Sequence, residues 1–242
     1  MAINFRKGGR YLLNVLLPRT CAHCAADLHY LEERPLCPGC AGALEPLPAL
    51  HCSTCGLPLS SGGQSCYDCR GAAPRSLSLA RSAFVFNPQL RSLVHAFKYL
   101  GREDLGGFLA GRMAEALPRF PELAPYNFTA AVPLHPAKLR ERGFNQAEVL
   151  AKRTAALANL FHLEGAARRL KNTKSQTSLS KTDRRRNMTG VFAVERPELV
   201  RGRRILLVDD VATTLATLES LAAEFKKAGA VSVAAYTLAR EP

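Results

Sequence analysis

The spacing of hydrophobic and polar positions changes near residue 77 and separates two parts of the chain. After that point, short apolar runs rich in β-branched and aromatic residues alternate with stretches whose apolar residues recur at i, i+3, i+4 and i+7. The short runs predict strands, at residues 80–86, 129–134, 191–194, 204–208 and 231–238. The helical spacing predicts helices, at residues 90–97, 105–117, 145–162 and 218–228. Strands that alternate with helices predict an α/β domain, in which flanking helices cover a mostly parallel sheet.

The segment before residue 72 has little apolar sequence and holds all eight cysteines of the chain. They form four C-x-x-C pairs, namely Cys21 with Cys24, Cys37 with Cys40, Cys52 with Cys55 and Cys66 with Cys69. Two such pairs supply the four thiolates of one tetrahedral zinc site, so four pairs predict two structural zinc ions. A segment of about 50 residues with so small a core needs the free energy of metal binding to fold.

Sequential pairing would place the first two cysteine pairs on one ion and the last two on the other. This arrangement needs only two local hairpins, whereas a cross-braced one needs interleaved loops, and we favour the sequential one. An iron–sulfur cluster or a redox dithiol would use the same residue type, but four spread pairs favour zinc. His23 and His51 adjoin the pairs, and we expect them to be solvent-facing neighbours rather than ligands.

Glycine and proline residues around residues 62–74 predict a domain boundary near residues 72–77. We expect an amphipathic helix over 1–18, a double zinc ribbon over 19–72 and the α/β domain over 77–242. The basic and apolar residues of the start imitate a signal peptide, but Pro18, Arg19 and Thr20 replace the small residues that cleavage requires.

Apolar runs in the chain fall far short of the ~18 residues that cross a bilayer, so we expect no membrane span. We therefore expect a cytoplasmic location, or one at the inner face of the membrane. The reducing conditions of the cytosol argue against disulfides.

Composition and charge narrow the class of partner. The chain has 242 residues, of which 47% are hydrophobic, and this excludes a disordered or fibrous protein. Its net charge of +13 favours a polyanionic partner, which is nucleic acid, a phosphorylated small molecule or an acidic membrane surface. Residues 138–204 contain 17 lysines and arginines against six acidic residues, a net charge of +11. Most of the excess charge therefore lies in one third of the chain.

The stretch 205–217 joins an apolar strand, two adjacent carboxylates and a threonine-rich loop before a helix. The carboxyl ends of parallel strands are where α/β sheets bind ligands. Backbone N–H groups at the start of a helix bind phosphate, while Asp209 and Asp210 can hold a ribose directly or through Mg²⁺. Two other interpretations are an acidic strand end of the Walker B kind and an ordinary cap, in which Thr213 and Thr214 satisfy their own helix.

The same stretch resembles the phosphoribosyl-pyrophosphate (PRPP) motif of type I phosphoribosyltransferases, in which two acidic residues hold the ribose and the loop holds the 5′-phosphate. That motif usually has glycine where this chain has Leu215. Glycine allows positive φ and close approach of the backbone, which leucine resists, so the departure speaks against tight phosphate binding. The resemblance assigns PRPP and phosphate binding to Asp209, Asp210, Thr213, Thr214, Ala216 and Thr217, with Lys98 reaching the site from a helix end.

Residues 132–146 and 169–187, together with the paired cysteines, closely resemble the ComF family. The Arg-Gly-Phe-Asn-Gln string at 142–146 is its most specific feature, and the resemblance covers residues 18–238. Members of this family combine zinc ribbons with a phosphoribosyltransferase fold. They are associated with natural transformation, the uptake of external DNA as a single strand. The resemblance implies a type I phosphoribosyltransferase-like fold behind a double zinc ribbon.

The resemblance also identifies residues 138–146 as a pyrophosphate-binding loop and residues 168–187 as a mobile hood. Arginine donates in pairs to phosphate oxygens, so both segments suit pyrophosphate or a nucleic-acid backbone. A solvated surface loop is the alternative. The candidate residues are Lys138, Arg140, Arg142, Asn145, Gln146, Arg169, Lys174, Gln176, Arg184, Arg185 and Arg186. Phe144 and Tyr99 are candidate stacking platforms for bases, although each aromatic by itself is more typical of a core.

Three functions from different classes stay open. The first is a competence-type protein that binds single-stranded DNA in the cytosol and passes it to a helicase or recombination protein. The second is a phosphoribosyltransferase that uses PRPP and Mg²⁺, in which carboxylates and arginines stabilise a ribose cation and the departing pyrophosphate. The third is an adaptor whose zinc ribbons dock a protein. Leu215 leaves the question of catalysis open.

Overall fold

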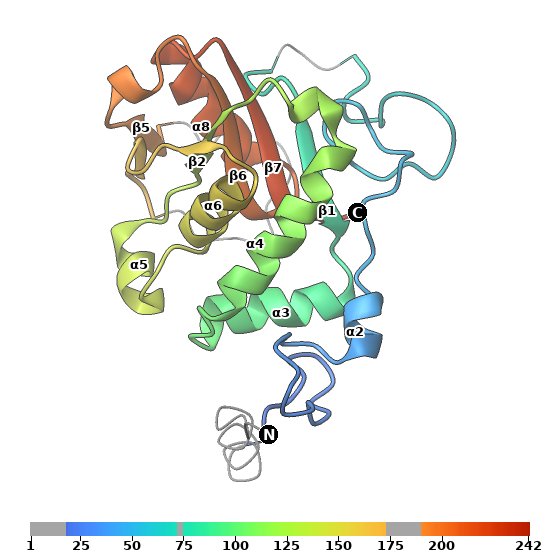
Figure 1. The fold of residues 1–242 in the computed structure, drawn as a ribbon. Coiled ribbons are helices and arrows are strands. Elements are labelled where there is room, and N and C mark those ends of the chain that lie inside the picture. Colours follow the sequence, from blue (N-terminus) through green and yellow to red (C-terminus); the bar gives the residue numbers. More distant parts are fainter. Residues whose placement is uncertain (1–17, 72–74, 173–189) are drawn as a thin grey trace.

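The computed structural model describes residues 18–71, 75–172 and 190–242, so nearly all of the helix expected over 1–18 lies outside the described residues. The chain after the cysteine segment forms an α/β unit around one parallel sheet (Figure 1). The strands lie in the order β1-β7-β6-β2-β3 and every neighbouring pair is parallel. Their bounds are Ala80–Val85 (β1), Ser232–Arg240 (β7), Arg204–Ala212 (β6), Phe128–Ala131 (β2) and Phe161–His162 (β3). The predicted fold class is confirmed.

Helices cover both faces of this sheet (Figure 1). Four consecutive residues of β6 are buried, as expected for a central strand with two covered faces. Leu206 and Val208 join the core cluster that includes α3 and α4, while Ile205 and Leu207 join the cluster that includes α8. The helices are α2 (Pro38–Gly42), α3 (Pro88–Tyr99), α4 (Leu105–Ala116), α5 (Pro136–Arg142), α6 (Gln146–Leu157) and α8 (Ala216–Lys227). Short 3₁₀ turns occur at Leu117–Arg119, Pro121–Leu123 and Pro197–Leu199.

Several elements differ from the sequence prediction. The helix predicted over 145–162 ends at Leu157, and Asn159 turns the chain through a positive φ of 54° into β3. The run at 191–194 does not enter the main sheet, because β5 (Phe192–Val194) pairs antiparallel with β4 (Ala167–Arg169) in a separate two-stranded sheet. Residues expected as a loop form α5, which His135 caps through Nδ1 and which ends at Gly143 with φ 82°.

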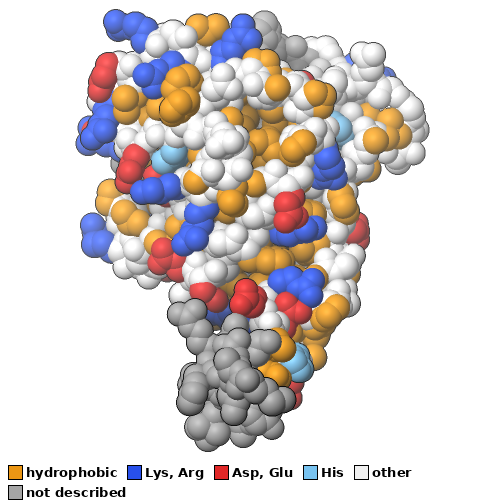
Figure 2. Space-filling model, in the orientation of Figure 1, with side chains coloured by type: hydrophobic (Ala, Val, Ile, Leu, Met, Phe, Trp, Pro, Cys, Tyr) orange, Lys and Arg blue, Asp and Glu red, His pale blue; other side chains and the backbone are white. Residues whose placement is uncertain are grey.

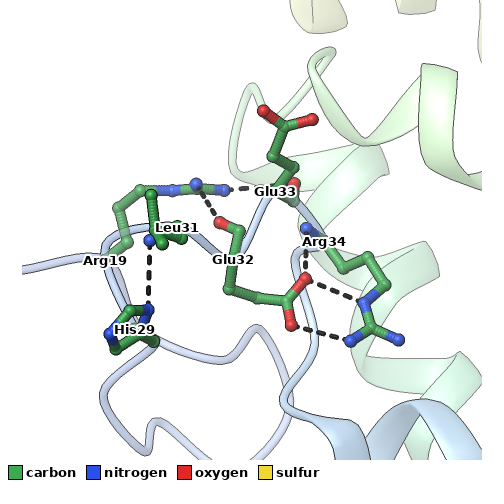
Figure 3. Close-up of polar contacts among 6 residues, drawn as sticks. All are labelled: Arg19, His29, Leu31, Glu32, Glu33 and Arg34. Atoms are coloured by element: carbon green, nitrogen blue, oxygen red, sulfur yellow. Dashed lines mark hydrogen bonds and ion pairs between the residues drawn. The ribbon is translucent and has the colours of Figure 1, made fainter. Parts of the chain in front are cut away.

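The cysteine segment has little regular structure besides α2 and packs along β1. Arg19 donates from Nη1 to the carbonyl of Glu32 at 2.6 Å, and the carboxylate of Glu32 pairs with Arg34 at 2.7 Å (Figure 3). Three backbone hydrogen bonds fasten the segment to the first strand, from Leu47 N to Ala83 O, from Val85 N to Glu45 O and from Ala80 N to Thr54 O. The ribbons and the sheet therefore form one packed unit.

In the part of the chain that the structure describes, no helix combines the length and the apolar character that crossing a membrane would require.

Candidate functional site

The eight cysteines form two separate clusters, each built from two successive pairs. In each cluster the four Sγ atoms lie within 4.8 Å of one another, and the clusters are Cys21, Cys24, Cys37, Cys40 and Cys52, Cys55, Cys66, Cys69. Sγ atoms of different pairs lie 3.8 Å apart in the first cluster and 3.6 Å apart in the second. Four sulfurs at about 2.3 Å from a tetrahedral zinc ion would be about 3.8 Å apart. The residues fit two zinc ions, with the sequential pairing.

Backbone N–H groups prepare one thiol of each cluster for a metal. Burial acts to raise the pKa of Cys21, but hydrogen bonds from the backbone of Cys24 and Cys37 outweigh it and lower this pKa to about 6. Burial acts to raise the pKa of Cys52 in the same way, but hydrogen bonds from the backbone of Cys55 and Cys66 outweigh it and lower this pKa to about 6. Zinc binds the thiolate, so a lowered pKa favours loading at neutral pH.

The two neighbouring histidines take other roles. His23 Nδ1 lies 2.9 Å from Ser92 Oγ on α3, and His51 Nδ1 lies 2.7 Å from the carbonyl of Pro48. Neither belongs to a sulfur cluster. Both are partly exposed, and His23 also ties the first ribbon to the α/β unit.

The two adjacent aspartates lie inside the last part of β6, which continues to Ala212 rather than ending at Val208. Asp210 is buried and pairs through Oδ2 with Lys98 Nζ at 2.6 Å. Burial acts to lower the pKa of Lys98, but the negative charge of Asp210 outweighs it and raises this pKa above its ordinary value. The end of α3 is thereby joined to the carboxyl edge of the sheet, where Lys98 was expected.

Asp209 has a different environment. Its Oδ1 accepts a hydrogen bond from Asp210 N at 2.9 Å, and no residue of the described part forms an ion pair with it. Burial, and next the negative charge of Asp210, raise its pKa to about 7. A carboxyl group with such a pKa is ready to exchange its proton for a cationic or hydroxyl-bearing ligand near neutral pH.

The loop after β6 adopts the backbone conformation that glycine usually provides. Leu215 has φ 62° and ψ 4° and is only 6% exposed, because its side chain packs into the core cluster of Leu218 and Phe225. The left-handed conformation costs a non-glycine residue about 1–2 kcal/mol. Leu215 adopts this conformation although leucine was expected to resist it. Its side chain lies in the core and not in the loop where a phosphate would bind.

Among the described residues, no side chain caps the start of α8 firmly. The closest is Thr214 Oγ1, which lies 3.5 Å from the backbone N of Ala216, at the limit of a hydrogen bond. Thr213 is exposed, and Thr214, Ala216 and Thr217 are partly exposed. This geometry favours the phosphate site over the interpretation in which the threonines satisfy their own helix.

Arg240, at the end of β7, joins this loop to the second cysteine cluster. Its buried guanidinium donates to the carbonyls of Ala212 at 3.0 Å, Thr213 at 2.5 Å and Cys55 at 3.2 Å. Sequence analysis missed Arg240, because a single arginine at a strand end carries no motif.

Cationic side chains gather beside the aspartates, and we name Lys98, Lys138, Arg142 and Arg169 the cationic cluster. Burial lowers the pKa of Lys138, and the positive charges of Arg169 and Arg142 lower it further. Lys98 acts on this pKa in the same direction. Burial also lowers the pKa of Arg169, against the negative charge of Asp209. These shifts show that the positive charges of the cationic cluster lie close enough to act on the pKa of Lys138.

Other residues of the predicted pyrophosphate loop divide between the surface and the core. Arg142 lies over the exposed ring of Tyr99, at 4.8 Å from the ring centroid, and donates to Tyr99 Oη at 3.2 Å and to Gln146 Oε1 at 3.1 Å. Arg140 is exposed on α5. Asn145 caps α6 and donates to the carbonyl of Val132, so its amide serves the backbone.

The two candidate stacking residues differ. The Phe144 ring packs on Phe97 in the core at 5.3 Å, whereas Tyr99 is 57% exposed. Basic side chains also lie along the edge of the molecule formed by β5, α6 and α5 (Figure 2). Five candidate residues of the predicted hood lie outside the described residues, namely Lys174, Gln176, Arg184, Arg185 and Arg186.

Comparison with known proteins gives two family matches and several relatives along nearly the whole chain. Residues 12–70 match a double zinc ribbon domain, and residues 145–242 match a phosphoribosyl transferase domain. Competence protein F of Haemophilus influenzae is 30% identical over 225 residues, which are 91% of this chain and 96% of that protein. DNA utilization protein YhgH of Salmonella typhimurium is 30% identical over 93% of this chain and 98% of its own. Competence protein ComFC of Streptococcus pneumoniae is 27% identical over 86% of this chain and 89% of its own.

Proposed function

This chain belongs to the ComF family, and we propose that it serves natural transformation by binding incoming single-stranded DNA in the cytosol. The names of its relatives, competence proteins and DNA utilization proteins, support a role in DNA uptake. The observation that carries the binding mode is the cationic cluster at the carboxyl edge of the sheet. A helicase or recombination protein that receives the strand belongs to the same proposal.

The cationic cluster favours a polyanion because its positive charges repel one another. The pKa of Lys138 is lowered by burial and by three neighbouring positive charges, and a bound phosphate would relieve that repulsion. Tyr99 adds an exposed ring beside Arg142, which suits the stacking of an unpaired base. Phosphate contacts of this kind hold a strand regardless of its sequence.

Fluorescence anisotropy with a labelled oligonucleotide, measured from about 50 to 200 mM salt, tests the proposal. For single strands the slope of log K against log salt is about −0.7 per phosphate contact, so Arg142→Ala and Lys138→Ala should each flatten it by about 0.7. Arg112→Ala is the matched control, because Arg112 pairs with Glu115 and lies over the ring of Phe84 on β1. The pair Arg184→Ala and Arg185→Ala should weaken binding of every sequence alike. Absence of binding at low salt would refute the proposal.

A second ligand is favoured by the aspartates and by the conformation of Leu215. We propose that Asp209 and Asp210 hold the ribose of PRPP while the start of α8 receives its 5′-phosphate. Mg²⁺, when bound, would neutralise pyrophosphate charge and be held by carboxylate oxygens. Lys138 and Arg169 would then stabilise the pyrophosphate, the group that leaves in a phosphoribosyl transfer.

Calorimetry with PRPP and Mg²⁺ tests this second ligand. The native chain should release heat, and Asp209→Ala and Asp210→Ala should abolish it. Because PRPP and DNA would share Lys138 and Arg169, PRPP should also displace the labelled oligonucleotide. If no heat appears with the native chain, the fold is a scaffold for the DNA alone.

A further inference from the structure

A pocket of about 560 Å³ lies next to the cationic cluster and shares Arg169 with it. It opens between the end of β2, the starts of α5 and α6, and β4 with the residues before it. Most of its walls are apolar, from Leu134, Leu139, Leu163 and Leu170. Pockets of this size and character take small organic groups.

One carboxylate of the pocket is held in a fixed orientation. Glu148 Oε1 lies 2.6 Å from His162 Nε2, and His162 Nδ1 lies 3.1 Å from Thr129 Oγ1. The side chain of His162 is only 9% exposed and Thr129 is fully buried, so the support behind the carboxylate is rigid. The other oxygen, Oε2, has no hydrogen-bond partner among the described residues. Glu148 thus offers an acceptor to whatever enters the pocket.

The charges around the pocket are sorted by sign. Arg168 and Arg169 line one wall, and Arg169 also belongs to the cationic cluster. Two carboxylates, those of Glu148 and Glu164, line the other part and would repel a phosphate. The cavity therefore suits a neutral, flat group that bears a hydrogen-bond donor and is attached to a phosphate chain outside.

We propose that this pocket takes one unstacked nucleobase of the bound strand, and that Glu148 accepts a hydrogen bond from an exocyclic amino group of that base. The inference rests on the proposed binding of single-stranded DNA. Cytosine carries an amino group at the position where thymine carries a carbonyl oxygen, and carboxylates accept from that amino group. Thymine would turn an acceptor toward Glu148 and leave both groups unsatisfied. The protein should therefore prefer strands with amino-bearing bases.

The test uses the full chain with zinc bound and compares strands of about 12 deoxycytidines or 12 thymidines, which carry the same number of phosphates. We expect the native protein to bind the cytosine strand about fivefold to tenfold more tightly at pH 7.5. Glu148→Gln should bring this ratio close to one. Glu164→Gln is the matched control, because it removes the same charge from the pocket without touching the His162 contact, and it should raise both affinities while leaving the ratio unchanged.

A second measurement leaves the protein unaltered, in case Glu148→Gln fails to fold. Strands of N4,N4-dimethylcytosine lack both amino hydrogens, and we expect the native protein to bind them no better than thymine strands. Equal affinity for cytosine and thymine strands would overturn this inference and leave the binding of DNA intact. An equal change of the ratio in both glutamate variants would also overturn it. Failure to bind either strand would refute the proposed function itself.

Discussion

Replacing Asp209 by asparagine should stabilise the protein at pH 8, and this gain should shrink as the pH falls. Burial and the charge of Asp210 raise the pKa of Asp209 from its ordinary 3.8 to about 7. The unfolded chain ionises this group near pH 4, so the native state bears a growing cost between about pH 4 and 7 and the full cost above that range. Asparagine keeps the acceptor for Asp210 N and removes the cost.

The size of the gain follows from the shift. About three pKa units correspond to an upper limit of about 4 kcal/mol at pH 8. Asp209 is only partly buried, so water screens part of this charge. We therefore expect about 1–2 kcal/mol, a rise of about 2–8 °C in Tm for a chain of this length. The gain at pH 6 should be smaller by about 1 kcal/mol or less.

Asp210→Asn is the companion variant with the opposite expected sign. It leaves the Lys98 ammonium, which is 20% exposed, without its partner at 2.6 Å. Loss of one member of a buried ion pair costs about 3–5 kcal/mol, and the partial exposure of Lys98 together with the charge of Asp209 reduces this to about 1–3 kcal/mol. The two isosteric substitutions at neighbouring positions should therefore move Tm in opposite directions at pH 8.

Thermal unfolding followed by circular dichroism, with zinc present and at pH 6, 7 and 8, measures both effects. Asp209→Asn should also lose the heat of PRPP binding, since the charge that strains the fold is the one that meets the ribose. A lower Tm for Asp209→Asn at pH 8, or a gain independent of pH, would show that Asp209 is not a strained carboxylate.

Three further outcomes follow from the structure. Leu215→Gly should be less stable than the native chain but more stable than Leu215→Ala by about 1 kcal/mol, because glycine alone is free of the cost of positive φ. Chemical denaturation measures the difference, and equal stability of the two variants would contradict the left-handed conformation of residue 215. Arg240→Met should lower stability by about 2–4 kcal/mol by leaving buried carbonyls unsatisfied, and should speed zinc release to a chromogenic chelator in only one of two kinetic phases. Cys24→Ser and Cys69→Ser should each reduce bound zinc from two equivalents to one, whereas cross-braced sites would lose both in either variant.

Much of the fold was readable from spacing alone. The near-continuous apolar run of β6 identified a central parallel strand, and the cysteine pairs were sufficient for two local clusters. The prediction that the run at 191–194 joins the main sheet was wrong, because four apolar residues look the same in a parallel sheet and in an antiparallel pair. Only the partner strand, β4, distinguishes the two arrangements. The early end of α6 depends on the positive φ of Asn159, which the helical composition on both sides concealed.

The candidate site was readable only where residues stand in a local motif. Asp209 and Asp210 lie next to each other in the sequence, but the pairing of Asp210 with Lys98 joins positions 112 residues apart. The sequence did not indicate Arg240 and His162 for the same reason, because their partners come from distant elements. Asn145 stands in a specific string that predicts ligand binding, and its amide also donates to the carbonyl of Val132, a contact that the string does not indicate.

Leu215 shows how a motif can lose its glycine and keep its geometry. The left-handed conformation costs a leucine about 1–2 kcal/mol, but burial of its side chain contributes about 1.5–3 kcal/mol. The two terms nearly cancel or favour leucine, because the side chain enters the core formed with Leu218 and Phe225. Arg240 holds the preceding carbonyls in place from behind. The start of α8 therefore stays free of side-chain atoms from Leu215, and the residue that seemed to argue against a phosphate ligand leaves room for one.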